Sequence, residues 1–362
     1  MTASGLAGAA RGLAFSAGAL LLALATAGLL LAAAGQDPVV SFQGMVETAF
    51  GSTYAIGNTI MKALPRLLPA LGIALALRAG LWNIGAEGQI YVGAAACTAV
   101  ALFGPLLPFP LGAGLALVAA MAAGAAWAAV PGVLRAYRGI SEVITTLMLV
   151  YVAIQLTNWL IEGPWLVENS TWPATPMVPE AFRLPRIWPG TLVNAGVVVA
   201  LFAAVLTGLI VTRTTFGLWI RAVGGNERAS AVIGLPRRRL IVAALAASGA
   251  FAGLAGGVEV LGIRGRLLEG FSPGYGFEAI AIALLGRLNP AGIVAAALLF
   301  GALDAGAAGL QVASAGISSA IAPVIQALAV AYLLAGLGGA RLIARRREAR
   351  SALARAGAGD RG

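Results

Sequence analysis

Apolar stretches of helical length alternate with short polar breaks along almost the whole chain. About 20 mainly apolar residues are needed for one helix to cross a bilayer. Stretches of this kind lie at residues 12–34, 56–77, 86–104, 110–130, 141–161, 191–212, 239–261, 276–287, 291–310 and 317–338. The pattern predicts an all-α polytopic membrane protein with about ten transmembrane helices.

The first and the eighth of these stretches differ from an ordinary span in length. The first has 23 residues, more than the roughly 7–15 of a secretory signal core, which favours an uncleaved anchor over a cleaved signal. The eighth has only 12 residues. A helix of about 18 Å is too short for a hydrocarbon core of about 30 Å, so irregular backbone at 270–274 must complete this crossing.

Basic residues predict the orientation, because Lys and Arg are retained in cytoplasmic loops. With both termini in the cytoplasm, 18 of the 24 basic residues fall inside. The other six lie outside or at the outer end of a span: Lys62, Arg66, Arg183, Arg186, Arg264 and Arg266. The net charge of +10 is therefore interpreted as a topology signal, and not as a nucleic-acid surface. These features predict a multi-pass membrane protein with both termini in the cytoplasm and membrane lipid around it.

Span parity divides the chain into two inverted five-helix halves, residues 1–161 and 191–338. Irregular Gly-rich segments at 81–88 and 270–274 open the third and the eighth span. Interrupted segments at corresponding places in inverted halves are typical of a transport pathway near the repeat interface. The alternative is a pair of packing kinks in an inert scaffold.

Three segments are expected outside the bilayer: an extracytoplasmic loop at 162–190, a cytoplasmic loop at 213–238 and a basic cytoplasmic tail at 339–362. In the first, tryptophans and six prolines favour an interfacial loop over a docking surface. In the second, Asn226 can cap a short helix from Glu227, and Gly234 offers a left-handed exit. The exposed apolar residues of that helix fit either a partner's groove or a solvated loop.

The residue inventory excludes several chemistries. The chain has no His, and Cys97 and Lys62 are its single cysteine and lysine. Imidazole bases, His or Cys metal sites and the phosphate-binding loop ending in Gly-Lys-Ser/Thr are therefore absent. We expect no catalytic residue, no metal and no cofactor.

Ionisable residues within spans are costly, so each is a functional candidate. Asp304 lies well inside the ninth span, where it either lines a pathway or pairs with a polar group on another span. Glu142 is read as ordinary helix-start chemistry, and Glu259 as a residue near an interface and Arg264.

Glu87 and Glu278 lie beside the two broken junctions, which the topology places at opposite membrane faces. They are candidates for the pathway, or for structural pairs with Arg78 and Arg287.

Four stretches, at residues 78–93, 139–149, 216–234 and 274–290, resemble the permeases of ATP-binding-cassette (ABC) importers. The closest group is the nucleoside and simple-sugar permeases, which belong with the branched-chain amino acid and ribose type. Asn-Ile-Gly-Ala-Glu-Gly-Gln at 83–89 is the most specific match, and the likeness runs from about residue 10 to 340. Departures at Val150, Glu278 and Ala279 leave the exact substrate contacts open.

The resemblance implies a ten-span permease in the cytoplasmic (inner) membrane of a prokaryote. Such a permease works with a second permease subunit, a pair of cytoplasmic ATPases and an extracytoplasmic solute-binding protein. It implies that the loop helix is the coupling helix gripped by the ATPase. The residues assigned to it are Asn226, Glu227, Arg228, Ala229, Val232, Ile233 and Gly234.

The leading hypothesis is a permease subunit that imports a nucleoside or simple sugar. Residues expected near its pathway are Asn83, Glu87, Gln89, Glu278, Asn289 and Asp304. Another small polar solute is the nearest alternative. A membrane-embedded enzyme is disfavoured, because the chain has no paired-Asp motif and no His. A passive channel would leave the cytoplasmic helix without a use.

Overall fold

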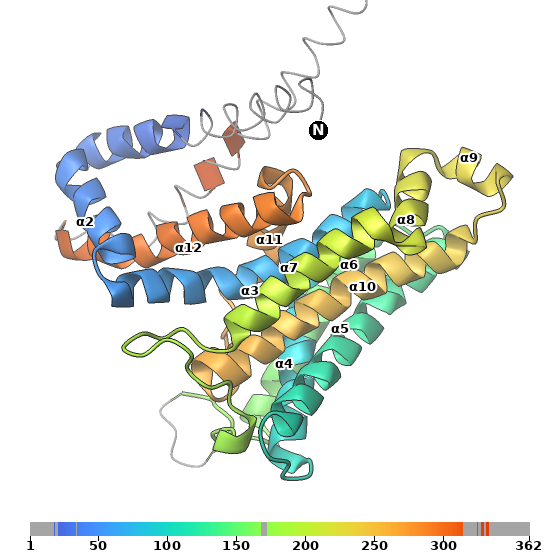
Figure 1. Ribbon diagram of the computed structural model, residues 1–362, viewed down its shortest axis with the longest axis horizontal. Coiled ribbons are helices and arrows are strands. Elements are labelled where there is room, and N and C mark those ends of the chain that lie inside the picture. Colours follow the sequence, from blue (N-terminus) through green and yellow to red (C-terminus); the bar gives the residue numbers. More distant parts are fainter. Residues whose placement is uncertain are drawn as a thin grey trace, which may run out of the picture. The chain divides into compact units, whose positions relative to one another are not determined.

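The computed structural model describes residues 18, 21–33, 35–167, 172–313, 324, 327–328 and 331–332. In this part of the chain every regular element is helical, and two isolated β-bridges join Ala174 with Leu268 and Arg186 with Asn194 (Figure 1). The elements are α2 (Pro38–Phe50), α3 (Thr53–Arg78), α4 (Ala86–Phe103), α5 (Leu111–Arg138), α6 (Glu142–Glu162), η1 (Glu180–Phe182), α7 (Gly196–Arg213), α8 (Thr215–Gly225), α9 (Glu227–Val232), α10 (Arg237–Val258), η2 (Glu259–Arg264), α11 (Tyr275–Leu285) and α12 (Pro290–Ala313).

Within the described residues, seven helices are long and apolar enough to cross a membrane. They are α3, α4, α5, α6, α7, the continuous α10 and η2, and α12. Two shorter apolar helices, Leu21–Ala33 and Tyr275–Leu285, coincide with the first and the eighth predicted span. The chain is therefore a multi-pass helical membrane protein. Most of the predicted span at 317–338 and the whole tail at 339–362 lie outside the described residues, so the ten-span arrangement stays a prediction.

One boundary differs widely from the sequence prediction, and one helix was not predicted. The fourth predicted span ends at residue 130, whereas α5 continues through Pro131 to Arg138. Proline is tolerated inside membrane helices because neighbouring groups satisfy the freed carbonyl. Helix α2 has 13 residues, too few to cross a bilayer, and its segment is therefore not among the predicted spans.

The chain divides into two compact units, residues 1–46 with 306–362, and residues 47–305. In the first, the Thr26 and Tyr332 hydroxyls lie 2.8 Å apart. The second unit contains both broken junctions and every predicted pathway residue.

Helix α10 is the centre of the second unit, because it packs against α3, α4 and α5. In the most apolar 18-residue stretch of each helix, 83% of the residues are buried in α3 and 72% in α10 with η2, but only 28% in α5 and in α6. The unit thus has a core of α3, α4 and α10, surrounded by helices that are largely exposed.

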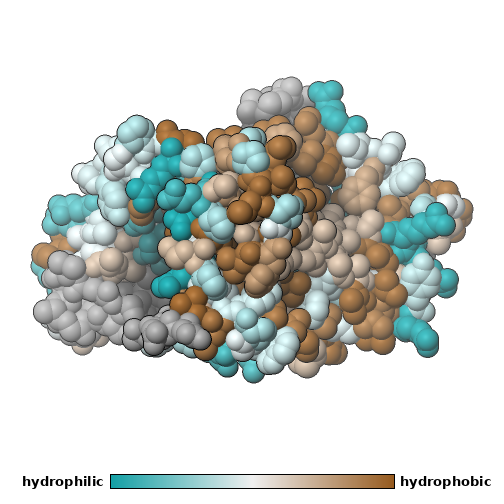
Figure 2. Space-filling model, turned by 90° about the horizontal axis from the view of Figure 1, so that it is seen from below, coloured by the Kyte–Doolittle hydropathy of each residue, from teal (hydrophilic) through white to brown (hydrophobic). Residues whose placement is uncertain are grey.

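The surrounding helices expose apolar side chains in number. On α6, Met148, Tyr151 and Trp159 are more than half exposed, as are Phe202 and Val205 on α7. Figure 2 shows hydrophobic side chains over much of the visible face. Apolar patches of this extent indicate contact with lipid or with another membrane helix.

Glycines allow the core helices to approach one another closely. A Cβ atom on Gly253 of α10 would collide with the Ala120 carbonyl of α5 and lie 3.1 Å from the Gly124 Cα atom. Backbone contact of this kind requires small residues at the interface, which is the usual solution between membrane helices. The abundance of glycine therefore reflects helix packing.

Replacing Gly253 by Ala is expected to lower the free energy of unfolding by about 1–3 kcal/mol, because the added methyl group overpacks the α5–α10 contact. The measurement is denaturant unfolding of the purified protein in mixed micelles. Gly114→Ala on exposed α5 is the matched control, since a Cβ atom there meets nothing within 4 Å. Equal stability of the two variants would contradict this packing argument.

Candidate functional site

Helix α3 carries two basic residues inside its apolar length. Lys62 and Arg66 are four residues apart, so they lie on the same face of the helix. Arg66 is 2% exposed and donates to the Lys62 carbonyl at 2.6 Å. A charge buried this deeply requires charged partners.

Arg66 finds those partners on α11 and α12. Its Nε atom pairs with the Glu278 carboxylate, and its Nη2 atom lies 3.1 Å from Asp304 Oδ2. The Tyr275 ring lies 4.7 Å from the guanidinium carbon, in cation–π geometry. Lys62 Nζ also approaches Asp304 Oδ2, at 3.2 Å. Two bases and two acids thus tie α3, α11 and α12 together.

A second ion pair lies at the end of α10. There the chain continues as a π-helical turn, η2, in which Arg264 Nε lies 2.9 Å from Glu259 Oε1. Arg264 also donates to the Phe271 carbonyl at 2.8 Å, which holds the segment after the turn. Glu259 is 1% exposed.

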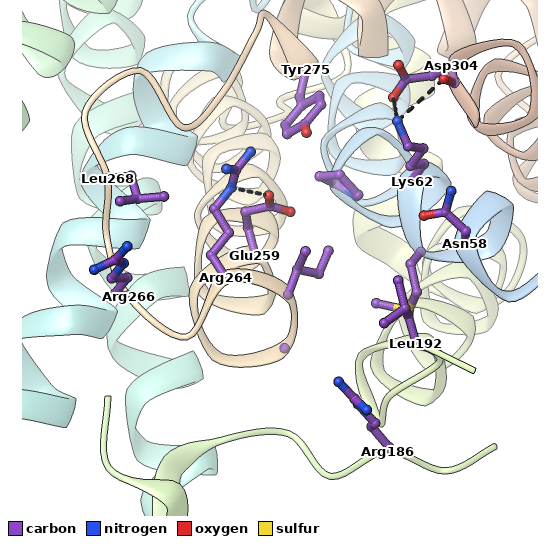
Figure 3. A pocket seen from close by; sticks show the side chains of 14 residues that line it. Asn58, Lys62, Arg186, Leu192, Glu259, Arg264, Arg266, Leu268, Tyr275 and Asp304 are labelled. Carbon is purple, nitrogen blue, oxygen red and sulfur yellow. Dashed lines mark hydrogen bonds and ion pairs between the residues drawn. The ribbon is translucent and has the colours of Figure 1, made fainter. Parts of the chain in front are cut away.

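Residues of both ion-paired groups, among them Lys62, Asp304 and Glu259, line one cavity of about 500 Å³ (Figure 3). Its size is within the ~300–1,000 Å³ of small-molecule sites. The residues that line it are Asn58, Met61, Lys62, Pro65, Arg186, Leu192, Glu259, Gly262, Ile263, Arg264, Arg266, Leu268, Tyr275 and Asp304. The lining offers both hydrogen-bond donors and acceptors.

One wall of the cavity is built by the segment expected as a loose interfacial loop. Its backbone N–H groups at Thr175, Val178 and Leu184 donate to carbonyls of Leu267, Gly265 and Leu261. These bonds hold the loop against η2 and the segment after it, and Arg186 of the loop lines the cavity. The loop is therefore part of the site.

Glu87 and Glu278, expected at opposite membrane faces, belong to helix starts that meet. The Gly276 N–H at the start of α11 donates to Glu87 Oε2 at 2.6 Å. Both α4 and α11 begin at broken junctions, so their first turns can meet within the bundle. A structural pair of Glu278 with Arg287 was the alternative to a pathway role, and in the structure Arg66 pairs with that carboxylate instead.

The predicted pathway residues fall into separate groups. Asp304 lines the cavity and pairs with Arg66 of α3, so the pairing offered for it is observed, while its place on a pathway stays a prediction. Asn83 and Gln89 form a buried reciprocal amide pair, at 2.8 and 3.0 Å, with Ser248 at 2.9 Å from Asn83 Nδ2. That pair is a structural tie away from the cavity lining.

Asn289 is exposed and caps α12, since its Oδ1 accepts from the Ala291 N–H at 3.0 Å. The structure gives it a local role at a helix start.

Sequence reasoning missed Lys62, Arg66, Arg264 and Tyr275 as site residues. The signal was present in the charge map. Four of the six basic residues assigned to the outer side line the cavity: Lys62, Arg186, Arg264 and Arg266. Arg66 adjoins it through Asp304.

The predicted loop helix is present as α9, Glu227–Val232. Asn226 Oδ1 accepts from the Ala229 N–H at 3.0 Å, as a cap does, and Gly234 has a φ of 78°. Val232 is 87% exposed and Ile233 71%. This short helix therefore presents apolar side chains without a covering element in the described chain.

Membrane-spanning helices around a polar cavity are the arrangement that a transport permease requires. The chain belongs to the family described as branched-chain amino acid transport system / permease component, which it matches over residues 55–338. It is a permease of the ABC-importer type and not an enzyme. Permeases of this family work with ATPase and solute-binding partners.

The most similar relatives include three permeases. The glucose ABC transporter permease protein TsgB13 of Haloferax volcanii is 37% identical, covering 87% of this chain and 85% of the relative. The guanosine permease protein NupP of Bacillus subtilis is 36% identical over 87% and 91%. The nucleoside permease protein NupB of Lactococcus lactis subsp. cremoris is 34% identical over 84% and 86%. No solved structure matches the chain.

Replacing Arg66 by Gln is expected to lower the free energy of unfolding by about 3 kcal/mol or more, because Glu278 loses its buried partner. Thermal unfolding in detergent measures the loss. The control is Lys62→Gln, which removes a partly exposed cation while Arg66 still pairs with Asp304. An Arg66 variant as stable as the control would contradict the central role of the guanidinium.

Proposed function

We propose that this chain is the permease subunit of an ABC importer for a nucleoside or simple sugar. The carrying observation is the cavity of about 500 Å³, in whose lining four of the six charged residues form two ion pairs, Lys62 with Asp304 and Arg264 with Glu259. Relatives named for glucose, guanosine and nucleosides support this class of solute.

The two ion pairs in the lining support a neutral, hydroxyl-rich solute. Ion pairs between Lys62 and Asp304, and between Arg264 and Glu259, offer cationic donors beside anionic acceptors. A hydroxyl group can use both, because it donates one hydrogen bond and accepts others. Tyr275 and Met61 add the apolar surface that a sugar ring or a base requires.

The inverted halves are supported by the pairing of helices in the core. Helix α3 of the first half packs on α11 of the second, and α10 of the second packs on α4 of the first. The second and third spans of the chain are α3 and α4, and the corresponding spans of the second half are α10 and α11. Exchanging the halves therefore converts the α3–α11 pair into the α10–α4 pair. Between them, the starts of α4 and α11 meet at Glu87 and Gly276. We infer that the solute passes near this repeat interface.

The remaining pathway residues follow from this inference. Asp304 acts at the cavity and Glu278 acts beside it through Arg66. Glu87, Asn83 and Gln89 hold the neighbouring junctions. Asn289 stays a pathway candidate only through its place at the start of α12.

The orientation that follows puts the cavity on the outer side and both termini in the cytoplasm of a prokaryotic cell. Basic residues around the cavity are the ones that depart from the positive-inside distribution. A solute-binding protein delivers solute on this side, and a second permease subunit covers part of the exposed apolar surface.

Helix α9 is the proposed contact with the ATPase. Its exposed Val232 and Ile233 are apolar anchors of the kind that a groove accepts. From there, α8 leads back to the end of α3. A Cβ atom on Gly224 would collide with the Arg78 carbonyl and lie 2.8 Å from the Gly80 nitrogen, so these backbones touch. Motion of α9 can thus reach α3, which carries Lys62.

The first test is reconstitution of the chain with its ATPase, second permease and binding protein in proteoliposomes. Uptake of guanosine or glucose driven by ATP is the expected result. Val232→Asp should weaken binding of the ATPase about 10-fold or more, since loss of 1.4 kcal/mol has that effect. The control is Met177→Asp, because Met177 is exposed in the loop at 162–190, which is expected on the other side of the membrane. Unchanged ATPase binding in the Val232 variant would remove α9 from the coupling role.

A second prediction concerns the contact between α8 and α3. Gly224→Ala should retain ATPase binding but reduce uptake about tenfold, the effect of losing about 1.4 kcal/mol of coupling. Gly225→Ala is matched in sequence and chemistry, yet a Cβ atom there meets nothing within 4 Å. Uptake per hydrolysed ATP is the measurement. If both variants transport equally, the α8–α3 contact does not transmit the motion.

A further inference from the structure

Glu259 differs from the other carboxylates around the cavity in its hydrogen bonding. Its Oε1 atom accepts from Arg264 Nε at 2.9 Å. Its Oε2 atom is buried, and no donor in the described part of the chain reaches it. Asp304, by contrast, pairs with two cations, Lys62 and Arg66.

The geometry of Arg264 explains why one carboxylate oxygen stays without a donor. A guanidinium often binds a carboxylate through two parallel hydrogen bonds. Here Arg264 uses Nε for Glu259 and directs Nη2 to the Phe271 carbonyl at 2.8 Å. The arginine is thus divided between two acceptors, and Glu259 Oε2 receives nothing from it.

A buried polar atom without a partner is rare in folded proteins, because its desolvation is not compensated. Two further observations connect this one with a ligand. Glu259 lines the cavity, where Figure 3 shows its carboxylate beside Arg264 and below Tyr275. It also begins the π-helical turn η2, and such turns occur frequently at functional sites.

We propose that Glu259 is a solute-binding residue whose Oε2 atom accepts a hydrogen bond from a hydroxyl or N–H group of the solute. The proposal rests on the proposed import function, and it assigns a residue that determines specificity. An ionised carboxylate only accepts hydrogen bonds, so the solute group must be a donor.

The oxygen is covered in the conformation described here. The solute therefore reaches it when the adjoining wall parts, as alternating access requires. Binding then supplies the missing donor, which makes the interaction selective. A site that leaves a polar group unpaired discriminates strongly against an analogue that lacks the complementary group.

The experiment measures uptake by the full reconstituted importer, with guanosine or glucose as the probe that wild type transports. Glu259→Gln keeps the size of the side chain and removes the charge. It should reduce uptake efficiency for the parent solute about 10-fold or more, the worth of a hydrogen bond to a charged group. For the analogue that lacks the critical donor, wild type and variant should transport equally.

Analogues distinguish the two sources of the donor. Deoxy derivatives of the sugar or ribose each remove one hydroxyl group, and N1-methylguanosine removes a base N–H. If wild type prefers the parent solute to one deoxy analogue and the Glu259→Gln variant does not, the donor is the hydroxyl group that this analogue lacks. If the same holds for N1-methylguanosine, the donor is the base N–H group. Discrimination that survives in the variant for every analogue overturns the proposal.

Glu142→Gln is the matched control, because Glu142 is also buried and ion-paired, with Arg135 Nε at 3.2 Å. It lies outside the cavity lining. Its KM and analogue selectivity should match wild type. A change in selectivity equal to that of Glu259→Gln would show a general effect of lost ion pairs and would overturn the proposal.

Wild-type protein supplies an independent measurement if the Glu259 variant does not assemble. A hydrophobic carbodiimide modifies buried carboxylates, and peptide mapping locates the product. Bound solute should slow the modification of Glu259 and should not change the rate at which Glu142 is modified. Equal modification of Glu259 with and without solute overturns the proposal. Absence of any uptake or solute protection in the wild-type complex, with both probes, would instead refute the proposed import function.

Discussion

The buried guanidinium of Arg66 constrains much of the arrangement around the cavity. An ion removed from water costs several kcal/mol unless opposite charges and hydrogen bonds surround it. Helices α11 and α12 therefore have to present Glu278 and Asp304 to α3. Tyr275 covers the guanidinium from the start of α11. The short helix α11 is thus held at its first turns, where it also meets Glu87.

Around this fixed centre, the carboxylates differ in how completely they are satisfied. Asp304 is engaged by two cations, whereas Glu259 has one oxygen without a donor in the described chain. The difference separates groups that hold the helices together from a group with capacity to bind. The same separation applies to the amides, because Asn83 and Gln89 satisfy each other. Polar residues inside a membrane protein are therefore not equivalent as pathway candidates.

Local composition predicted much of the fold. Spans from 56–77 to 291–310 correspond to helices, because length and hydropathy act within each stretch. The broken junctions were also predicted, since Gly-rich segments interrupt helices. The errors arose where a local rule was overridden. Pro131 does not end α5, and Glu259, dismissed as an interfacial residue, is buried beside the cavity.

The sequence determined the class of protein, the apolar stretches, the breaks between them and the chemical groups available, because these depend on residues close together in the chain. The tertiary structure alone decided which charges meet. Arg66 pairs with Glu278 and Asp304, 212 and 238 residues away. Partners at such separations are chosen by helix packing, through contacts such as that of Gly253 with α5. No local pattern encodes them, so Lys62 and Arg66 were read as topology signals until the fold placed them at the cavity.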